Sequence, residues 1–219
     1  LNGWVNNAGN TPIPGSTNEG AFFPGLTNAQ AYAALQAQFT QTQGAWTDLM
    51  DWLQNHPTVQ SAVYGYEVMN EAAGYSHSID ANGAGQGLTL ASFVQLYADH
   101  CIALSNLIQA RDDANILVEG WGYGGDFATL NTTMINGVSA LNYLRAGIGA
   151  DLIWSAHLYP GWAGTGNAAD PTALAALLDA HFAPLTGNNV IVTETNISGT
   201  VDDPSAADDV VDFFAASQE

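Results

Sequence analysis

Residues 64–71 read Tyr-Gly-Tyr-Glu-Val-Met-Asn-Glu, and residues 190–196 read Val-Ile-Val-Thr-Glu-Thr-Asn. Each contains a short, largely apolar run, which is typical of a strand buried in a parallel sheet. Each strand-like run also reaches a glutamate, Glu71 or Glu194, where the chain passes into more polar sequence. Together these two stretches predict parallel strands whose final side chains face a common set of loops.

Further strand-like and helix-like segments alternate outside these two stretches. The predicted strands cover residues 1–6, 62–69, 115–120, 152–158 and 190–195. The predicted helices cover residues 28–39, 44–55, 89–110, 172–182 and 204–216. Alternation of strand and helix is the pattern of a parallel sheet with right-handed crossover connections.

The long connections follow the strands rather than precede them. Residues 7–27, 72–88, 120–125 and 160–170 are polar or rich in glycine and proline. In a (β/α)8 barrel these loops build the active site. A dinucleotide-binding fold would instead show a Gly-x-Gly-x-x-Gly fingerprint closing its first strand, and the predicted strand at residues 1–6 is not followed by one. We therefore predict an α/β protein with a single domain over residues 1–219. The expected architecture is a (β/α)8 TIM barrel, present as an incomplete barrel that lacks strands at both ends.

The composition restricts the partners that the chain can have. It has 219 residues, of which 47% are hydrophobic and 11% charged, enough apolar sequence for a sizeable core. Lys+Arg is 2 and Asp+Glu is 21, a net charge of −19 that repels phosphate backbones and anionic membranes. We therefore expect no nucleic acid and no membrane as partner, and acidic substrates are disfavoured, whereas a neutral substrate carries no such penalty. The single cysteine, Cys101, lies in an apolar helical pattern and is expected to be a buried thiol.

The residue types at the strand ends point to chemistry on sugars. Two carboxyls such as Glu71 and Glu194 can flank a glycosidic bond, one as acid and then base, the other as nucleophile. His157 and Tyr159 are two apart on a predicted strand and therefore share a face. They either satisfy each other's hydrogen bonds in the core or position a substrate beside the carboxyls.

At this point the chain resembles the clan A glycoside hydrolases, most closely family 5. The resemblance rests on Tyr64–Glu71, on residues 155–160 (Ser-Ala-His-Leu-Tyr-Pro) and on residues 190–196, in that order. It implies that Glu71 is the general acid/base, Glu194 the nucleophile and Asn70 the residue that binds the sugar 2-hydroxyl. It also implies that His157 and Tyr159 support the reaction. The family's usual proline after the Asn-Glu pair is Ala72 here.

The resemblance implies that the chain covers about strands 3 to 7 of the family barrel. It also implies a retaining endo-β-glycanase without metal or cofactor. Its substrate would be a neutral β-linked polysaccharide, either mannan or a cellulose-like glucan, and its place extracellular or periplasmic. Sugars stack on aromatic rings, so Trp4, Trp121 and Trp162, near predicted strand ends, are expected to bind substrate. Alternatives are an exo-β-glycosidase and a non-catalytic carbohydrate-binding protein on the same scaffold. No prediction follows for the oligomeric state.

The remaining candidates have simpler interpretations. Glu67 lies four residues before Glu71 and is expected to be a structural hydrogen-bonding residue. Glu119 could either bind a sugar hydroxyl or anchor its loop. Trp46 and Trp52 are expected to pack in the core. The chain has no Gly-x-Ser-x-Gly turn, which argues against a serine hydrolase.

Overall fold

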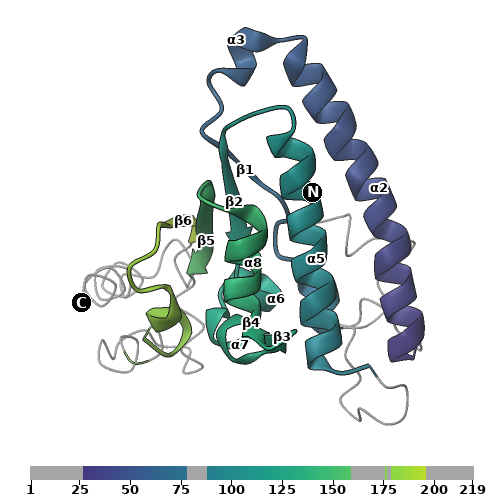
Figure 1. Cartoon of the computed structure of the whole chain (residues 1–219), viewed down its shortest axis with the longest axis vertical. Coiled ribbons are helices and arrows are strands. Elements are labelled where there is room, and N and C mark those ends of the chain that lie inside the picture. The colour runs from purple at the N-terminus through teal and green to yellow at the C-terminus, as the bar shows by residue number, and fades with distance from the viewer. Residues whose placement is uncertain (1–26, 78–87, 159–175, 177–178, 196–219) are drawn as a thin grey trace, which may run out of the picture.

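The structure, a computed structural model, describes residues 27–77, 88–158, 176 and 179–195 (Figure 1). Within these residues the main sheet is entirely parallel and has the order β1-β2-β5-β6. Its strands are β1 (Gly65–Glu67), β2 (Asn115–Glu119), β5 (Leu152–Leu158) and β6 (Val190–Thr195). Sequence order equals spatial order, as in consecutive strands of a barrel wall. The predicted strand at residues 1–6 and the predicted helix at residues 204–216 lie outside the described residues.

Three longer helices accompany the sheet: α2 (Asn28–Gln54), α5 (Leu90–Gln109) and α8 (Ala140–Ile148). In Figure 1, α5 and α8 run beside the strands and α2 lies outside α5. The shorter elements are α3 (Pro57–Gln60), α4 (Ala73–His77), α6 (Trp121–Gly124), α7 (Phe127–Thr132), β3 (Met134–Ile135), β4 (Val138–Ser139) and η2 (Ala183–Leu185). No described helix has the length and apolar character needed to cross a membrane.

Helix α2 corrects one sequence-based expectation. The sequence predicts two helices, over residues 28–39 and 44–55, but Asn28–Gln54 is a single helix. Thr27 caps its start, and the Thr27 and Gln30 side chains form a capping box. Gly44, between the two predicted segments, lowers helix propensity but does not end the helix, because tertiary packing outweighs propensity. Tyr32 and Phe39 supply that packing through their ring contacts with α5.

Helix α5 carries the largest share of the core between α2, α8 and the sheet. Phe93, Leu104 and Ile108 recur at helical spacing and are fully buried. Cys101 is also fully buried, which confirms the buried thiol, and burial raises the pKa of its thiol. Such a site leaves the thiol protonated and unreactive.

The two tryptophan predictions on α2 have different outcomes. Trp46 is buried at 5% exposure and packs edge-on to Tyr66, as expected. The expectation that Trp52 packs in the core is wrong, because Trp52 is 48% exposed and its ring stacks on His56. The difference follows from the helix surface: positions 46 and 52 are six residues apart and therefore lie on different faces of α2.

The segment between β2 and β5 contains structure that the sequence patterns do not predict. Helix α8 is capped by the Ser139 side chain and precedes β5. Strands β3 and β4 form a small hairpin whose turn residues, Asn136 and Gly137, both have positive φ. Asn-Gly is the preferred pair for such a turn.

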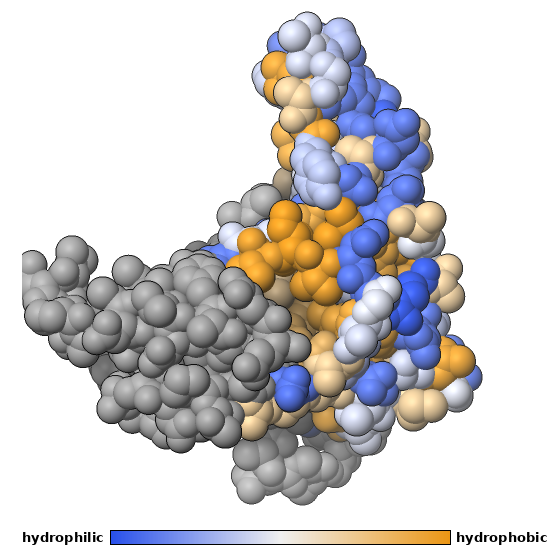
Figure 2. Space-filling model, turned by 90° about the vertical axis from the view of Figure 1, so that its left-hand side faces the viewer, coloured by the Kyte–Doolittle hydropathy of each residue, from blue (hydrophilic) through white to orange (hydrophobic). Residues whose placement is uncertain are grey.

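Apolar side chains are exposed along the last strand of the sheet. Val190 and Val192 of β6 are 44% and 48% exposed. Figure 2, viewed from the side on which β6 lies in Figure 1, shows apolar surface near the middle of the visible face. Polar groups, by contrast, gather at the carboxyl ends of the strands.

Candidate active site

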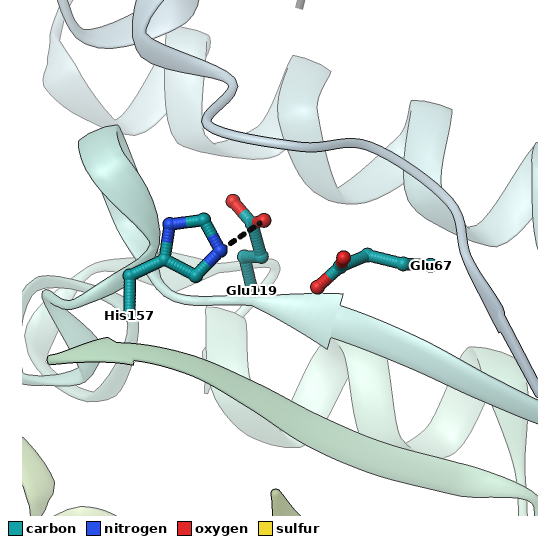
Figure 3. A group of neighbouring side chains, drawn as sticks. All are labelled: Glu67, Glu119 and His157. Carbon is teal, nitrogen blue, oxygen red and sulfur yellow. Dashed lines mark ion pairs between the residues drawn. The ribbon is translucent and has the colours of Figure 1, made fainter. Parts of the chain in front are cut away.

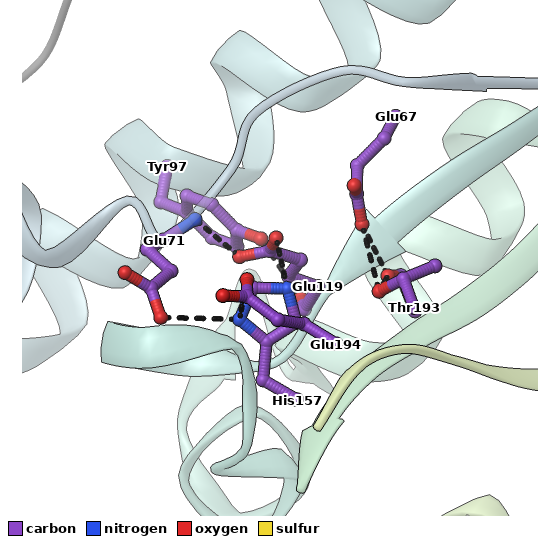
Figure 4. A network of polar contacts seen from close by, with 8 residues as sticks. Glu67, Glu71, Tyr97, Glu119, His157, Thr193 and Glu194 are labelled. Atoms are coloured by element: carbon purple, nitrogen blue, oxygen red, sulfur yellow. Dashed lines mark hydrogen bonds and ion pairs between the residues drawn. The ribbon is translucent and has the colours of Figure 1, made fainter. Parts of the chain in front are cut away.

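Four ionisable side chains meet where the parallel strands end (Figure 4). Glu119 is the last residue of β2, His157 lies near the end of β5, and Glu194 near the end of β6. Glu71 lies four residues beyond β1. This edge is where a (β/α)8 barrel places its active site.

His157 lies at the centre of the group and contacts three carboxyls. Its Nδ1 is 3.2 Å from Glu71 Oε1 and 3.2 Å from Glu194 Oε2. Its Nε2 is 3.1 Å from Glu119 Oε1. Glu71 and Glu194 thus contact the same ring nitrogen, and oxygens of these two carboxyls lie within 4.8 Å of one another.

Burial divides the group into a covered layer and an open layer. The side chains of His157 and Glu119 are 1% and 0% exposed. Those of Glu71 and Glu194 are 22% and 45% exposed. The two predicted catalytic carboxyls, Glu71 and Glu194, are therefore partly exposed to solvent. The His157 imidazole and the Glu119 carboxyl are buried behind them.

Glu71 reaches the site through an unusual backbone conformation. Its φ is 45°, in the left-handed region that side chains other than glycine adopt only at a cost. Its backbone N–H donates a hydrogen bond of 2.6 Å to Glu119 Oε2. A charge-assisted bond of this kind stabilises the turn that aims the Glu71 side chain at His157.

Glu194 reaches the site through a bulge in β6. Ala156 pairs with Val192, but the next residue, His157, pairs with Glu194, so Thr193 is the extra residue. In a regular strand Thr193 and Glu194 would point to opposite faces. Here the Thr193 hydroxyl lies 2.5 Å from the Ser155 hydroxyl, and Glu194 contacts His157 two residues further along β5. A bulge re-aims side chains in this way beside many active sites.

Glu67 lies deeper, on the far side of Glu119 from His157 (Figure 3). Its Oε1 accepts hydrogen bonds from the hydroxyls of Ser155 and Thr193. These contacts agree with the structural role expected for Glu67. An imidazole and carboxylates are also possible metal ligands, and among the described residues the two sets that are close enough are Glu67–Glu119–His157 and Glu71–His157–Glu194.

Burial and charge shift the protonation of the covered pair. Burial raises the pKa of Glu119 to about 7, although the contacts with His157 and with the Glu71 N–H oppose the increase. Burial alone would lower the pKa of His157, but Glu119, Glu71 and Glu194 outweigh it and raise the value to about 9. His157 is therefore cationic at neutral pH. The chain's two arginines lie elsewhere, Arg111 beside Asp51 and Arg145 beside Asn142 and Asn188.

A hollow of about 390 Å³ lies beside α6, the short helix that follows β2. Its volume is in the range of small-molecule sites. Trp121, Tyr123, Asp126 and His181 contribute to its lining. The Asp126 side chain caps α7 through Thr129 and also lies 3.7 Å from His181.

The structure brings part of the predicted site together. Glu71, Glu194 and His157 are in contact, and Asn70 is half-buried next to Glu71. Trp121, predicted as a sugar platform, is only 7% exposed and packs edge-on to Tyr97, although it also lines the hollow. Trp4, Tyr159 and Trp162 lie outside the described residues. Glu119 was expected either to bind a sugar hydroxyl or to anchor its loop, and neither interpretation includes its contacts with Glu71 and His157. The sequence feature that could have indicated these contacts is its position at the end of a predicted strand.

Comparisons with known proteins agree with this fold. The family model described as Cellulase (glycosyl hydrolase family 5) matches residues 24–218. The crystal structure of the native form of a beta-glucanase from Saccharophagus degradans is similar, with a TM-score of 0.53 and 20% sequence identity. That match covers 82% of this chain and 49% of the other, so the chain spans about half the length of that protein. At this identity the likeness supports the fold alone. No curated protein matches the chain.

Proposed function

The chain belongs to glycosyl hydrolase family 5, and from that premise we propose that it is a retaining endo-β-glycanase. Its fold is accordingly that of a (β/α)8 barrel, represented by the four parallel strands of the described residues. The proposed substrate is a neutral β-linked polysaccharide, either mannan or a cellulose-like glucan. We also place the protein outside the cytoplasm, in the extracellular medium or the periplasm, as part of the same proposal.

The observation that carries the proposal is the approach of Glu71 to Glu194. Retaining glycosidases hold their two carboxyls about 5–5.5 Å apart, whereas inverting enzymes leave about 6.5–9.5 Å for a water molecule. One oxygen of Glu71 and one oxygen of Glu194 lie within 4.8 Å of each other. This close approach of the two side chains supports the retaining arrangement. Glu194 is then close enough to attack the anomeric carbon while Glu71 protonates the leaving oxygen. Glu71 subsequently activates the water that releases the sugar.

His157 is placed to follow the change of charge during this reaction. Its Nδ1 is equally distant from Glu71 and Glu194. When Glu194 forms the glycosyl ester it loses its negative charge, and Glu71 gains one by giving up its proton. The His157 imidazolium lies within reach of one oxygen of Glu71 and one of Glu194. It can therefore stabilise whichever of the two carboxylates is charged.

The surroundings of the carboxyls favour an uncharged ligand with apolar faces. The net charge of −19 disfavours anionic polysaccharides. The hollow beside α6 presents Trp121 and Tyr123 together with the polar groups of Asp126 and His181. Aromatic rings with a few polar groups are typical of sites for neutral organic ligands such as sugars.

Hydrolysis of soluble β-mannan and of hydroxyethylcellulose, followed by reducing ends, tests the proposal. Glu71→Gln and Glu194→Gln should each lower turnover by at least about 10²–10⁴-fold. The matched control is Asp112→Asn, because Asp112 accepts bonds from Tyr66 and Gln60 at the opposite end of the sheet. Proton NMR of the first product should show the β-anomer, and formation of the α-anomer would contradict retention.

The same assay separates the alternatives. An endo-enzyme lowers viscosity steeply for few new reducing ends, whereas an exo-β-glycosidase releases small sugars with little loss of viscosity. A non-catalytic carbohydrate-binding protein would bind the polysaccharide without turnover. In that case Glu71→Gln and Glu194→Gln would leave the wild-type behaviour unchanged, and the enzymatic proposal would fail.

A further inference from the structure

We propose that Glu119 is a positioning residue that fixes both the general acid/base and the central histidine of this site. The inference rests on the proposed function, since it assigns a role in the same reaction. Glu119 would touch neither the sugar nor the reacting atoms. It would act through two different groups that do.

The two oxygens of Glu119 have separate tasks. Oε2 accepts the hydrogen bond of 2.6 Å from the backbone N–H of Glu71. Oε1 lies 3.1 Å from Nε2 of His157. Because Nε2 faces Glu119, the opposite ring nitrogen, Nδ1, is directed at Glu71 and Glu194. One carboxylate therefore sets the orientation of Glu71 at its backbone and that of His157 at its ring.

The surroundings hold Glu119 in place. The Tyr97 hydroxyl of α5 donates a bond of 2.8 Å to the backbone oxygen of Glu119. Gly124 closes the other side: a Cβ built there would lie 2.9 Å from His157 Cγ and 3.1 Å from Glu119 Oε2. The side chain of Glu119 is fully buried, so water is poorly placed to replace either of its contacts.

The backbone conformation of Glu71 depends on this hydrogen bond to Glu119. Its φ of 45° is unfavourable for a residue with a side chain. In this turn its backbone N–H donates a hydrogen bond to the Glu119 carboxyl. Loss of the acceptor would allow the backbone to relax toward negative φ. The Glu71 carboxyl would then move away from His157, and a misplacement of about 1 Å can lower a rate about 100-fold.

Among the described residues, the charged groups that face His157 are carboxyls. Glu119 faces it from β2, Glu194 from β6 and Glu71 from the turn after β1, with Glu67 behind Glu119. Removing the buried charge of Glu119 should therefore lower the proton affinity of His157 while leaving two carboxyls beside Nδ1. This effect is specific to an electrostatic role and would not arise from loss of packing alone.

The test compares Glu119→Gln and Glu119→Leu with Asp112→Asn in the full chain. Glu119→Gln keeps a possible acceptor for the Glu71 N–H but no charge, and Glu119→Leu keeps neither. We expect kcat on a neutral β-glycan to fall about 10–100-fold in Glu119→Gln and further in Glu119→Leu, with KM changed far less. Asp112→Asn should retain kcat. Activities are compared below each variant's melting temperature, so that the folded fraction is equal.

A second measurement is independent of turnover. Nitrogen-15 NMR follows the protonation of His157, with its signals assigned by their loss in His157→Asn. The midpoint should lie lower in Glu119→Gln than in the wild type and remain unchanged in Asp112→Asn. An unchanged midpoint, or equal kcat in Glu119→Gln and wild type, would overturn the inference. If the wild type shows no turnover but Glu119→Gln still lowers the midpoint, the proposed function is overturned while the contact between Glu119 and His157 stands.

Discussion

Glu71 and Glu194 reach the same ring nitrogen of His157 by different backbone means. Glu71 follows the three-residue strand β1 and depends on a single residue with φ of 45°. Glu194 lies within the six-residue strand β6 and depends on the extra residue Thr193. The first conformation is held by a side chain from the neighbouring strand, Glu119, and the second by the register of strand pairing itself.

This difference indicates which changes each side tolerates. A bulge in a paired strand is supported by main-chain hydrogen bonds on both sides of it, so single side chains contribute little. A left-handed residue in a turn has fewer supports, and the loss of one acceptor matters more. The Glu71 side should therefore be more sensitive to substitutions in its supporting shell than the Glu194 side.

The largest expected effect separates the chemical roles of the two carboxyls. With an aryl β-glycoside that has a good leaving group, Glu71→Ala should slow mainly the second step, and Glu194→Ala should abolish the first. Added azide should then give the β-glycosyl azide with Glu71→Ala and the α-glycosyl azide with Glu194→Ala, because the latter attack is a single inversion. Both products are identified by proton NMR. The same anomer from both variants would show that the roles are wrongly assigned.

The next largest effect concerns the shell on the Glu71 side. Gly124→Ala should lower stability by about 1–3 kcal/mol and reduce kcat, because the new Cβ collides with His157 and Glu119. Gly137→Ala is the matched control: Gly137 also has positive φ, but no atom lies within 4 Å of the position that a Cβ would take there. It should cost stability through backbone strain and leave kcat unchanged. Thermal melts and steady-state kinetics give both values, and equal kcat losses would contradict the close contact.

The pH dependence of stability tests the covered pair. The folded-state pKa values of Glu119, about 7, and His157, about 9, both lie above their ordinary values. At these two groups the folded chain binds protons more tightly than the unfolded chain, so their contribution to the free energy of unfolding should fall as pH rises from 4.5 to about 9. His157 contributes between pH 6.5 and 9, by roughly 1–3 kcal/mol. Urea unfolding at a fixed salt concentration measures the slope, which should flatten in His157→Asn. A wild-type slope of zero from pH 7 to 9 would contradict it.

The smallest effect is expected on the Glu194 side. Thr193→Val removes the hydroxyl that contacts Ser155 and Glu67 but retains the shape of the residue. We expect a loss of about 1 kcal/mol in stability and a change in kcat well below that of Glu119→Gln. A loss of kcat as large as that of Glu119→Gln would show that the hydroxyl, rather than strand register, aims Glu194.

Sequence patterns predict the elements with strong periodicity and miss those that local contacts determine. The strands at 152–158 and 190–195 have their predicted bounds, because apolar runs of this length are buried in parallel sheets. Residues 62–69 form only the strand Gly65–Glu67, since strand ends depend on pairing with a neighbour. Helix α8 and the Asn136–Gly137 hairpin are absent from the predicted elements, although a cap and a turn pair mark them.

The candidate site shows the same division. The contacts of Glu71 and Glu194 with His157 follow from strand ends that meet at one edge of the sheet, which a residue pattern can indicate. The positive φ of Glu71, the bulge at Thr193 and the double contact of Glu119 depend on tertiary packing. No pattern along the chain distinguishes a loop-anchoring glutamate from one that supports two partners.

The positions of the two arginines make limited proteolysis with trypsin a probe of local unfolding in this protein. Trypsin cleaves only after lysine or arginine, so this sequence offers it two bonds, after Arg111 and after Arg145. Arg145 lies inside α8, and Arg111 follows shortly after α5 and is tied to α2 through Asp51. The bond after Arg145 does not fit a protease while α8 is intact, so cleavage there reports local unfolding of that helix. Cleavage after Arg111 reports loosening of the turn that follows α5. The lengths of the fragments would reveal which of the two helical regions loosens first.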